Sequence, residues 1–170
     1  FENFAYVDKP FPIGFEQTIS QPYTVAFQTQ APEIKAGDKV LEIGSGSGYQ
    51  TSILVSMKAE VYSIERIYEL YKKSKRILSI LNLMPRKIIW EDGYLGSKKD
   101  APFDKILIAA ACVEIPMNLV QQLKVGGKMI IPIGNQKNQI MNLITRISKN
   151  KIKKTELGNF LFVPMLTNKI

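Results

Sequence analysis

The chain has 170 residues, of which 45% are apolar and 22% are charged, a composition typical of one soluble globular domain. It contains no histidine and a single cysteine, Cys112. These counts exclude histidine-dependent triads, histidine metal ligands, cysteine-rich metal clusters and internal disulfides. No apolar run approaches the roughly 20 residues of a membrane span.

The chain is basic, with 23 lysines and arginines against 15 aspartates and glutamates and a net charge of +8. Such a charge is compatible with general solubility, and also with a nucleic acid, a membrane or an acidic substrate as partner. The lysines are spread along the chain without interleaved aromatic residues, so we expect neither nucleic acid nor membrane as a partner. The single cysteine favours a reducing compartment. We therefore expect a cytoplasmic monomer.

The N-terminal third begins with a segment broken by proline and glycine. Residues 1–19 are predicted to be irregular. Ser20 is predicted to be the N-cap of a helix over residues 22–30, with Pro22 in its first turn. Further along the chain, the expected elements are a strand at 39–43, a helix at 49–57, a strand at 60–66, a helix at 67–83, strands at 86–90 and 103–110, a helix at 116–123, and strands at 126–134, 139–147 and 159–165.

Strands that alternate with helices predict an α/β fold with a doubly wound, mostly parallel sheet of seven strands. The last two strands follow each other without a helix, with a turn near Lys149–Asn150, and predict an antiparallel C-terminal edge. We expect residues 1–170 to form a single domain. Ligands of such sheets bind at the carboxyl ends of the strands, where strand order reverses.

A glycine loop follows the first strand of this pattern. The segment LEIGSGSG places Gly44, Gly46 and Gly48 where a ligand can approach the backbone closely. The spacing differs from the G-x-G-x-x-G of dinucleotide sites, and no lysine follows in the pattern that binds nucleoside triphosphates.

Two acidic residues follow the next two strands. Glu65 ends the second strand, where a carboxylate can accept hydrogen bonds from both hydroxyls of a ribose. Asp92 precedes Gly93 just after the third strand, at a height where it can accept a bond from an adenine amino group. Together with the glycine loop, these positions predict an adenosine that lies across the strand ends.

NAD and S-adenosylmethionine both carry adenosine. The loop lacks the later glycine of dinucleotide sites, and a strand pair after the fifth strand is more usual in methyltransferases, so S-adenosylmethionine is favoured. Glu42 lies just before the loop, near the expected place of the sulfonium amino acid. Its alternative role is that of a buried strand carboxylate bonded to backbone amides.

These segments, with others, resemble the protein-L-isoaspartate O-methyltransferase family. The resemblance extends over residues 4–167 and rests, in chain order, on PIGFEQTISQP, VLEIGSGSGYQ, SIERI, DG, APFDKILIAAA, EIP, QLKVGGKMIIPIG and FVPM. The glycine loop is shared with many methyltransferases, whereas QTISQP is far more specific to this family.

The resemblance implies a Rossmann-like class I methyltransferase that uses S-adenosylmethionine to methylate the free carboxylate of L-isoaspartyl residues, a step of protein repair. By the same resemblance, Ser20 is catalytic and orients that carboxylate. Thr18, Ile19 and Ser20 form the wall between substrate and cofactor. The cofactor-binding residues that it implies are Gln17, Thr18, Ile19, Ser20, Glu42, Gly44, Ser45, Gly46, Glu65, Arg66, Asp92 and Gly93.

The chain departs from the family pattern at a few positions. Phe15 and Glu16 stand where the family often has His-Gly, Ala109 where it often has Thr, and Glu91 where it often has Gly. The family's N-terminal helical segment is expected to be missing. Rival interpretations are a non-catalytic S-adenosylmethionine-binding module, another small methyltransferase such as one acting on nucleic acid, and an NAD-dependent oxidoreductase.

Overall fold

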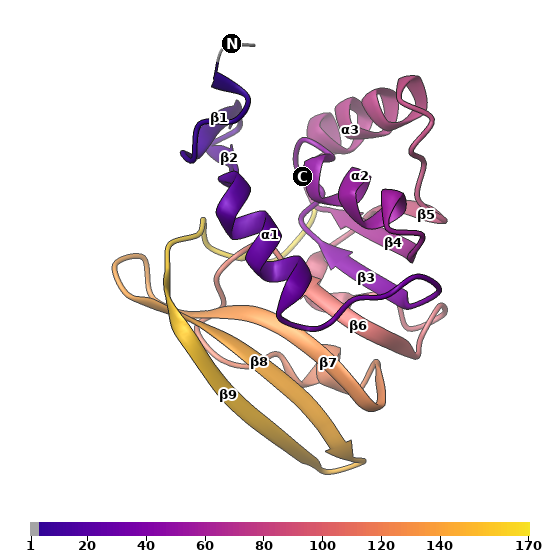
Figure 1. Ribbon diagram of the computed structural model, residues 1–170, viewed down its shortest axis with the longest axis vertical. Helices are drawn as coiled ribbons and strands as arrows, with labels where there is room; N and C mark the ends of the chain where they lie inside the picture. Colours follow the sequence, from indigo (N-terminus) through magenta and orange to yellow (C-terminus); the bar gives the residue numbers. More distant parts are fainter. Residues whose placement is uncertain (1–3) are drawn as a thin grey trace.

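The computed structural model describes residues 4–170, which form a seven-stranded sheet with helices on both sides (Figure 1). Three helices, α1 (Pro22–Gln30), α2 (Tyr49–Ser56) and α3 (Tyr68–Ile80), lie on one side. The short helix α4 (Met117–Val120) packs against the 3₁₀ turn η2 (Gly93–Leu95) on the other side. The strands of the sheet are β3 (Lys39–Ile43), β4 (Glu60–Glu65), β5 (Lys87–Trp90), β6 (Phe103–Ile108), β7 (Leu123–Gly134), β8 (Gln139–Ser148) and β9 (Lys151–Phe160).

The strands are arranged in the order β5-β4-β3-β6-β7-β8-β9. The pairs from β5 to β7 are parallel, whereas β8 runs antiparallel to both β7 and β9. The chain moves outward from β3 to β5 and then returns to the other side of β3, so strand order reverses between β3 and β6. This topology confirms the predicted doubly wound sheet with an antiparallel C-terminal edge. The ligand crevice of such sheets lies at this reversal.

Apolar side chains cover both faces of the central strands, which explains their nearly unbroken apolar runs. Under α1 and α2, Val40 and Leu107 pack in one cluster with Leu54 of α2. On the opposite face, Leu41 packs in a second cluster with Leu119 of α4. All five side chains are fully buried, and burial of each contributes about 1.5–3 kcal/mol relative to exposure. The two clusters hold the strand ends, and hence the residues that follow them, in fixed positions.

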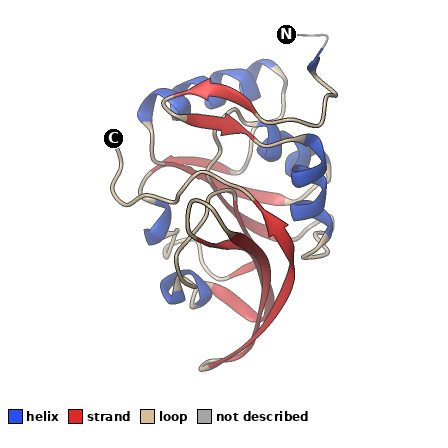
Figure 2. Cartoon of the chain, turned by 90° about the vertical axis from the view of Figure 1, so that its left-hand side faces the viewer, coloured by secondary structure: helices blue, strands red, loops and turns tan. Residues whose placement is uncertain are grey.

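The N-terminal region contains a hairpin where the sequence predicts irregular structure over residues 1–19, of which residues 1–3 lie outside the described range. β1 (Phe11–Gly14) pairs antiparallel with β2 (Gln17–Ile19), apart from the main sheet (Figure 2). The turn consists of Phe15 and Glu16, with φ angles of 54° and 58°. Glycine and asparagine are the usual residues at such angles. The turn therefore left no signal in the sequence, and the prediction was wrong here.

The last strand is also displaced from its predicted position. β9 covers Lys151–Phe160, whereas the sequence predicts a strand at 159–165, after the turn expected near Lys149–Asn150. β9 is the outermost strand and most of its residues are exposed, so lysines replace the apolar pattern that marks buried strands. Beyond it, Pro164 forms an isolated bridge with Ala111.

Helix α2 ends at Ser56, one residue before its predicted end, and two other helices end three residues early. α3 ends at Ile80, and Asn82 then takes a positive φ of 54° that a helix cannot contain. α4 ends at Val120, because β7 begins only three residues later at Leu123. None of the described helices is long and apolar enough to cross a membrane.

Candidate active site

A cleft opens at the carboxyl ends of β3, β4 and β6, between the sheet, the hairpin and α1. Ten of the twelve predicted site residues line it, and the other two, Glu42 and Asp92, do not. The ten are Gln17, Thr18, Ile19, Ser20, Gly44, Ser45, Gly46, Glu65, Arg66 and Gly93. Four separate stretches of sequence therefore converge on one cavity.

The glycine loop turns sharply back over the neighbouring strand. The amides of Gly44 and Ser45 both donate to the carbonyl of Ile64, at 2.8 and 3.2 Å. Gly44 has a φ of 93°, an angle that residues with a Cβ rarely adopt. A Cβ on Gly46 would come within 3.2 Å of Ile13 on β1. The loop thus lines the cleft, with β1 of the hairpin packed close to Gly46.

Glu65 lies at the end of β4 and is 4% exposed. One carboxylate oxygen accepts a hydrogen bond from the amide of Gly46, and the other accepts one from the amide of Ile67, both at 2.9 Å. Each oxygen keeps a second lone pair for a hydroxyl of a ligand. Glu65 can therefore brace the glycine loop and bind two hydroxyls at once.

Asp92 and Gly93 follow β5, but only Gly93 reaches the cleft surface. The Asp92 carboxylate accepts bonds from the amides of Tyr94, at 2.8 Å, and Asn168, at 2.6 Å. A Cβ on Gly93 would come within 2.5 Å of Ile43, so only glycine fits against β3. In this conformation Asp92 shapes the cleft floor from behind Gly93.

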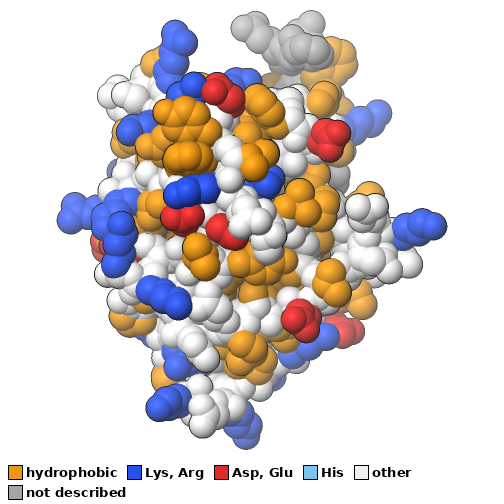
Figure 3. Space-filling view, turned by 180° about the vertical axis from the view of Figure 1, so that it is seen from behind, with side chains coloured by type: hydrophobic (Ala, Val, Ile, Leu, Met, Phe, Trp, Pro, Cys, Tyr) orange, Lys and Arg blue, Asp and Glu red, His pale blue; other side chains and the backbone are white. Residues whose placement is uncertain are grey.

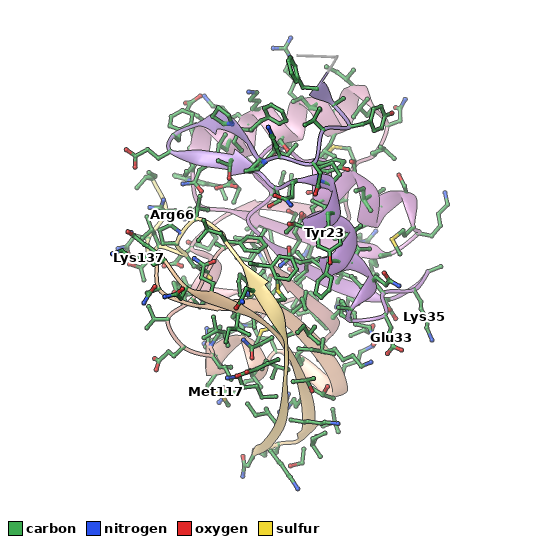
Figure 4. The ribbon with its side chains drawn as sticks, turned by 60° about the vertical axis from the view of Figure 1, so that its left-hand side comes forward. Tyr23, Glu33, Lys35, Arg66, Met117 and Lys137 are labelled. Carbon is green, nitrogen blue, oxygen red and sulfur yellow. The ribbon has the colours of Figure 1, made fainter. Side chains whose placement is uncertain are left out.

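Arg66 lines the cleft next to Glu65 and contacts the C-terminal segment. Its Nε donates to the carbonyl of Asn168 at 2.9 Å, and its own carbonyl accepts from the amide of Ile170 at 2.8 Å. Figure 4 shows the labelled Arg66 beside the trace of this segment. The arginine thus holds the last residues of the chain across the ends of β4 and β5.

Glu42 is fully buried beneath the loop instead of facing the cleft. Its Oε2 accepts hydrogen bonds from Thr51 and Ser63, both at 2.6 Å, while Oε1 has no partner among the described residues. Burial raises the pKa of Glu42 to about 7, against the opposing effect of the two hydroxyls. Its side chain points into the space between β3, β4 and α2, so Glu42 is not part of the cleft surface.

Ser20 lines the cleft directly after β2, but it is not the helix cap that the sequence predicts. The N-cap of α1 is Gln21, whose side chain does not bond the helix amides. Asp8 caps the helix instead, from outside it: its Oδ1 accepts a hydrogen bond from the backbone amide of Tyr23 at 2.9 Å. Its Oδ2 accepts a second bond, from the side-chain Nε2 of Gln21, at 3.2 Å. The Ser20 hydroxyl has no hydrogen-bond partner among the described residues, and Ser20 lines the cleft.

The cleft also contains residues that the sequence did not identify. Gln28 of α1 and Gln50 of α2 line its wall although they are 1% and 7% exposed. Residues 163–166 form another wall, held by bonds of 2.8 Å from the Ala111 amide to the Val163 carbonyl and from the Met165 amide to the Ala111 carbonyl. The FVPM motif was the available signal for this wall. Gln50 is the last residue of the VLEIGSGSGYQ motif, whereas Gln28 belongs to no motif.

The other chemically reactive groups lie elsewhere. Cys112 is 1% exposed, and burial raises the pKa of its thiol to about 11, which makes it a poor nucleophile. Within residues 4–170, no group of three or more cysteine, aspartate or glutamate side chains is placed to hold a metal ion. The cleft is therefore suited to binding and positioning by neutral side chains, the backbone, one carboxylate (Glu65) and one guanidinium (Arg66).

The comparisons with known proteins agree with this geometry. The family model described as protein-L-isoaspartate(D-aspartate) O-methyltransferase matches residues 1–170. Proteins named protein-L-isoaspartate O-methyltransferase, from Christiangramia forsetii and Flavobacterium psychrophilum, are each 53% identical to this chain over 169 residues, which covers 99% of it and 79% of theirs.

A solved structure supports the same assignment. A putative protein-L-isoaspartate O-methyltransferase from Plasmodium falciparum, crystallised with S-adenosyl-L-homocysteine, has a TM-score of 0.87 and 28% identity, over 99% of this chain and 84% of that one. The family match, the close relatives and the shared fold lead to one conclusion. The chain belongs to the protein-L-isoaspartate(D-aspartate) O-methyltransferase family.

Proposed function

We propose that this chain methylates the free carboxylate of L-isoaspartyl residues in damaged proteins. S-adenosylmethionine supplies an electrophilic methyl group, which forms a bond to a carboxylate oxygen while the methyl–sulfur electron pair stays on sulfur. A carboxylate has a pKa of about 3–4 and is ionised at neutral pH, so the enzyme needs no general base. This accounts for a cleft without histidine, in which orientation and exclusion of water are the tasks of the protein.

The free hydroxyl of Ser20 is the observation that carries this proposal. Asp8 caps α1 in its place, so the structure gives Ser20 no role in helix stability. Its hydroxyl can donate a hydrogen bond to a carboxylate and leave the negative charge of the carboxylate in place. A lysine or arginine would instead neutralise that charge by forming an ion pair. Thr18 and Ile19 precede it on β2 and line the same cleft, so this strand is the wall that holds the acceptor.

The residues across the strand ends fit an adenosyl cofactor. Gly93 after β5 leaves room for a flat ring, Glu65 after β4 offers two acceptor oxygens, and the loop from Gly44 to Gly46 exposes its backbone after β3. In this proposal Gly93 contacts the adenine, with Asp92 behind it. Glu65 with Arg66 flanks the ribose, and the loop with Gln17 contacts the methionyl part.

Radiolabelled methyl transfer to a synthetic isoaspartyl peptide tests the proposal, with the aspartyl peptide of the same sequence as control. We expect transfer to the isoaspartyl peptide alone. Equal labelling of both peptides, or of neither, would contradict the proposed substrate.

A non-catalytic S-adenosylmethionine-binding module is the second candidate. This candidate requires that Phe15 and Glu16 fill the substrate groove. In the structure both residues are exposed at the hairpin turn and do not line the cleft. This candidate would be supported if calorimetry detected cofactor binding while the methyl-transfer assay detected no labelled isoaspartyl peptide.

We further propose that the protein works as a cytoplasmic monomer without nucleic acid or membrane partners. Its one thiol is buried, and lysines and arginines are dispersed over the face shown in Figure 3 instead of gathering in one band. Light scattering and salt-dependent nucleic-acid binding assays test these points.

A further inference from the structure

Gln28 is a buried polar residue on the cleft wall that no motif explains. It lies on α1, two turns after Ser20, and its side chain is 1% exposed. Its Nε2 donates to the carbonyl of Ile108 at 2.9 Å and contacts the sulfur of Met141 at 3.7 Å. Because the nitrogen is held in this way, the amide oxygen remains free, with no partner among the described residues.

Gln50 shows the same arrangement on the neighbouring helix. Its Nε2 donates to Thr29 Oγ1 at 2.8 Å, and the Thr29 hydroxyl in turn donates to the Val25 carbonyl at 2.8 Å. Its amide oxygen also has no partner within the described part of the chain. Two anchored glutamines thus offer two neutral acceptor oxygens at one cavity.

Strand order indicates which end of the cofactor these oxygens meet. The proposed adenine and ribose contacts follow β5 and β4, and the glycine loop follows β3. The next strand in the sheet is β6, whose last residue, Ile108, bonds Gln28. A cofactor that lies across β5, β4 and β3 in this order therefore extends its amino-acid end toward Gln28.

The charge of that end requires an acceptor. The α-ammonium of the methionyl part is protonated at pH 7, since α-amino groups have pKa values near 7.7–8.0. Glu65 is the carboxylate among the described lining residues, and it lies at the opposite, ribose end. Glu42 is enclosed below the loop and bonded to two hydroxyls.

We infer that the side-chain oxygens of Gln28 and Gln50 bind the α-ammonium of the cofactor, whose amino-acid part the sequence placed near Glu42. Neutral acceptors hold the ammonium without adding negative charge near the isoaspartyl carboxylate, which enters the same cleft. The inference rests on the proposed function and extends it to the recognition of one group of the cofactor.

Calorimetry at pH 7 with S-adenosylhomocysteine and its analogue without the α-amino group tests the inference. The ratio of the two dissociation constants measures amino-group recognition. We expect Gln28→Leu to reduce this ratio about tenfold, the effect of losing a hydrogen bond to a charged group. Gln50→Leu should reduce it in the same direction. Gln30→Leu, an exposed glutamine on the same helix, should leave it unchanged.

The ratio separates recognition from structure. If Gln28→Leu weakens both ligands equally, the residue is structural and the inference is wrong. If the ratio is unchanged while the KM of an isoaspartyl peptide rises, the glutamine contacts substrate, and the inference is also wrong. Gln28→Met, with an unbranched side chain of similar length, provides the same test if the leucine variant does not fold. Failure of the wild type to bind either ligand would instead refute the cofactor site itself.

Discussion

The Glu65 carboxylate accepts a hydrogen bond of 2.9 Å from the Gly46 amide, and so joins the glycine loop to the end of β4. Its second oxygen is bonded to the Ile67 amide at the same distance. The carboxylate is thereby fixed before any ligand arrives. A preorganised acceptor of this kind loses little conformational entropy on binding.

Replacement of Glu65 should weaken cofactor binding. Glu65→Gln removes the charge and replaces one acceptor oxygen by a donor, so one of the two backbone bonds is lost. We expect the affinity for S-adenosylhomocysteine, measured by calorimetry, to fall at least about tenfold. Glu60→Gln, an exposed glutamate at the other end of β4, serves as the control. An unchanged affinity in Glu65→Gln would show that the ribose is held elsewhere.

Ser20 and Asp8 should give opposite phenotypes. Ser20→Ala is expected to lower kcat for an isoaspartyl peptide by about 100-fold or more, the usual effect of removing one oriented donor. Since Asp8 caps the helix, the free energy of unfolding should change by less than about 0.5 kcal/mol. Asp8→Ala should instead destabilise the protein by about 1 kcal/mol.

Both properties can be measured on the same two proteins by steady-state kinetics and urea unfolding. The affinity of Ser20→Ala for S-adenosylhomocysteine should stay within about twofold of the wild type, because its side chain acts on the acceptor. A destabilised Ser20→Ala protein with normal turnover would reverse the roles assigned to these residues.

Glu42 should make stability depend on pH near neutrality. Burial raises its pKa from 4.5 to about 7, so the folded state favours the protonated form. The resulting stabilisation is complete below about pH 4.5 and is lost as the pH rises through about 7. The chain contains no histidine, so no other side chain of ordinary pKa titrates in this window. Carboxyls with lowered pKa values, such as Asp104, are already ionised there.

Urea unfolding at pH 5.5 and pH 7.5 tests this expectation. The wild type should be less stable at the higher pH, and Glu42→Gln should show a much smaller difference, since its amide does not ionise. Glu156→Gln, an exposed glutamate on β9, should behave like the wild type. Equal pH differences in all three proteins would mean that Glu42 does not control this dependence.

A glycine in the hairpin turn should stabilise the folded protein. Glu16 has a φ of 58°, which costs a residue with a Cβ about 1–2 kcal/mol. Glu16→Gly removes this cost but adds flexibility to the unfolded chain, worth about 0.5–1 kcal/mol. We expect a net gain of about 0.5–1 kcal/mol in the free energy of unfolding. Glu33→Gly, at another exposed position of positive φ, is an unsuitable control because Glu33 is paired with Lys128.

Gly14→Ala is a better comparison for the hairpin. Gly14 has a φ of 94° with open space around its Cβ position, so alanine there should destabilise the protein through backbone strain alone. A loss of stability in Glu16→Gly would indicate that the glutamate side chain makes a stabilising contact.

Much of the fold could be predicted because its signals are local. The strands predicted at 39–43 and 103–110 are recognisable by short stretches of buried apolar residues, since both faces of β3 and β6 are covered. Gly44 and Glu65 could be assigned to one site because Gly44 directly follows one parallel strand and Glu65 ends the next, and such strands end at the same edge of the sheet. The position of β9 could not be predicted, because its exposed lysines follow no apolar period.

The sequence by itself determined the chain order of the main-sheet strands and the helices, the glycine loop, the acidic residues at the strand ends and the family. Each of these depends on neighbouring residues or on a contiguous motif. Only the tertiary structure decided that Asp8 caps α1, that Glu42 is enclosed, and that Gln28 is anchored to Ile108. The partners in the Asp8 and Gln28 contacts are 15 and 80 residues apart. Such contacts form only when packed elements bring distant side chains together, and no local pattern of residues encodes them.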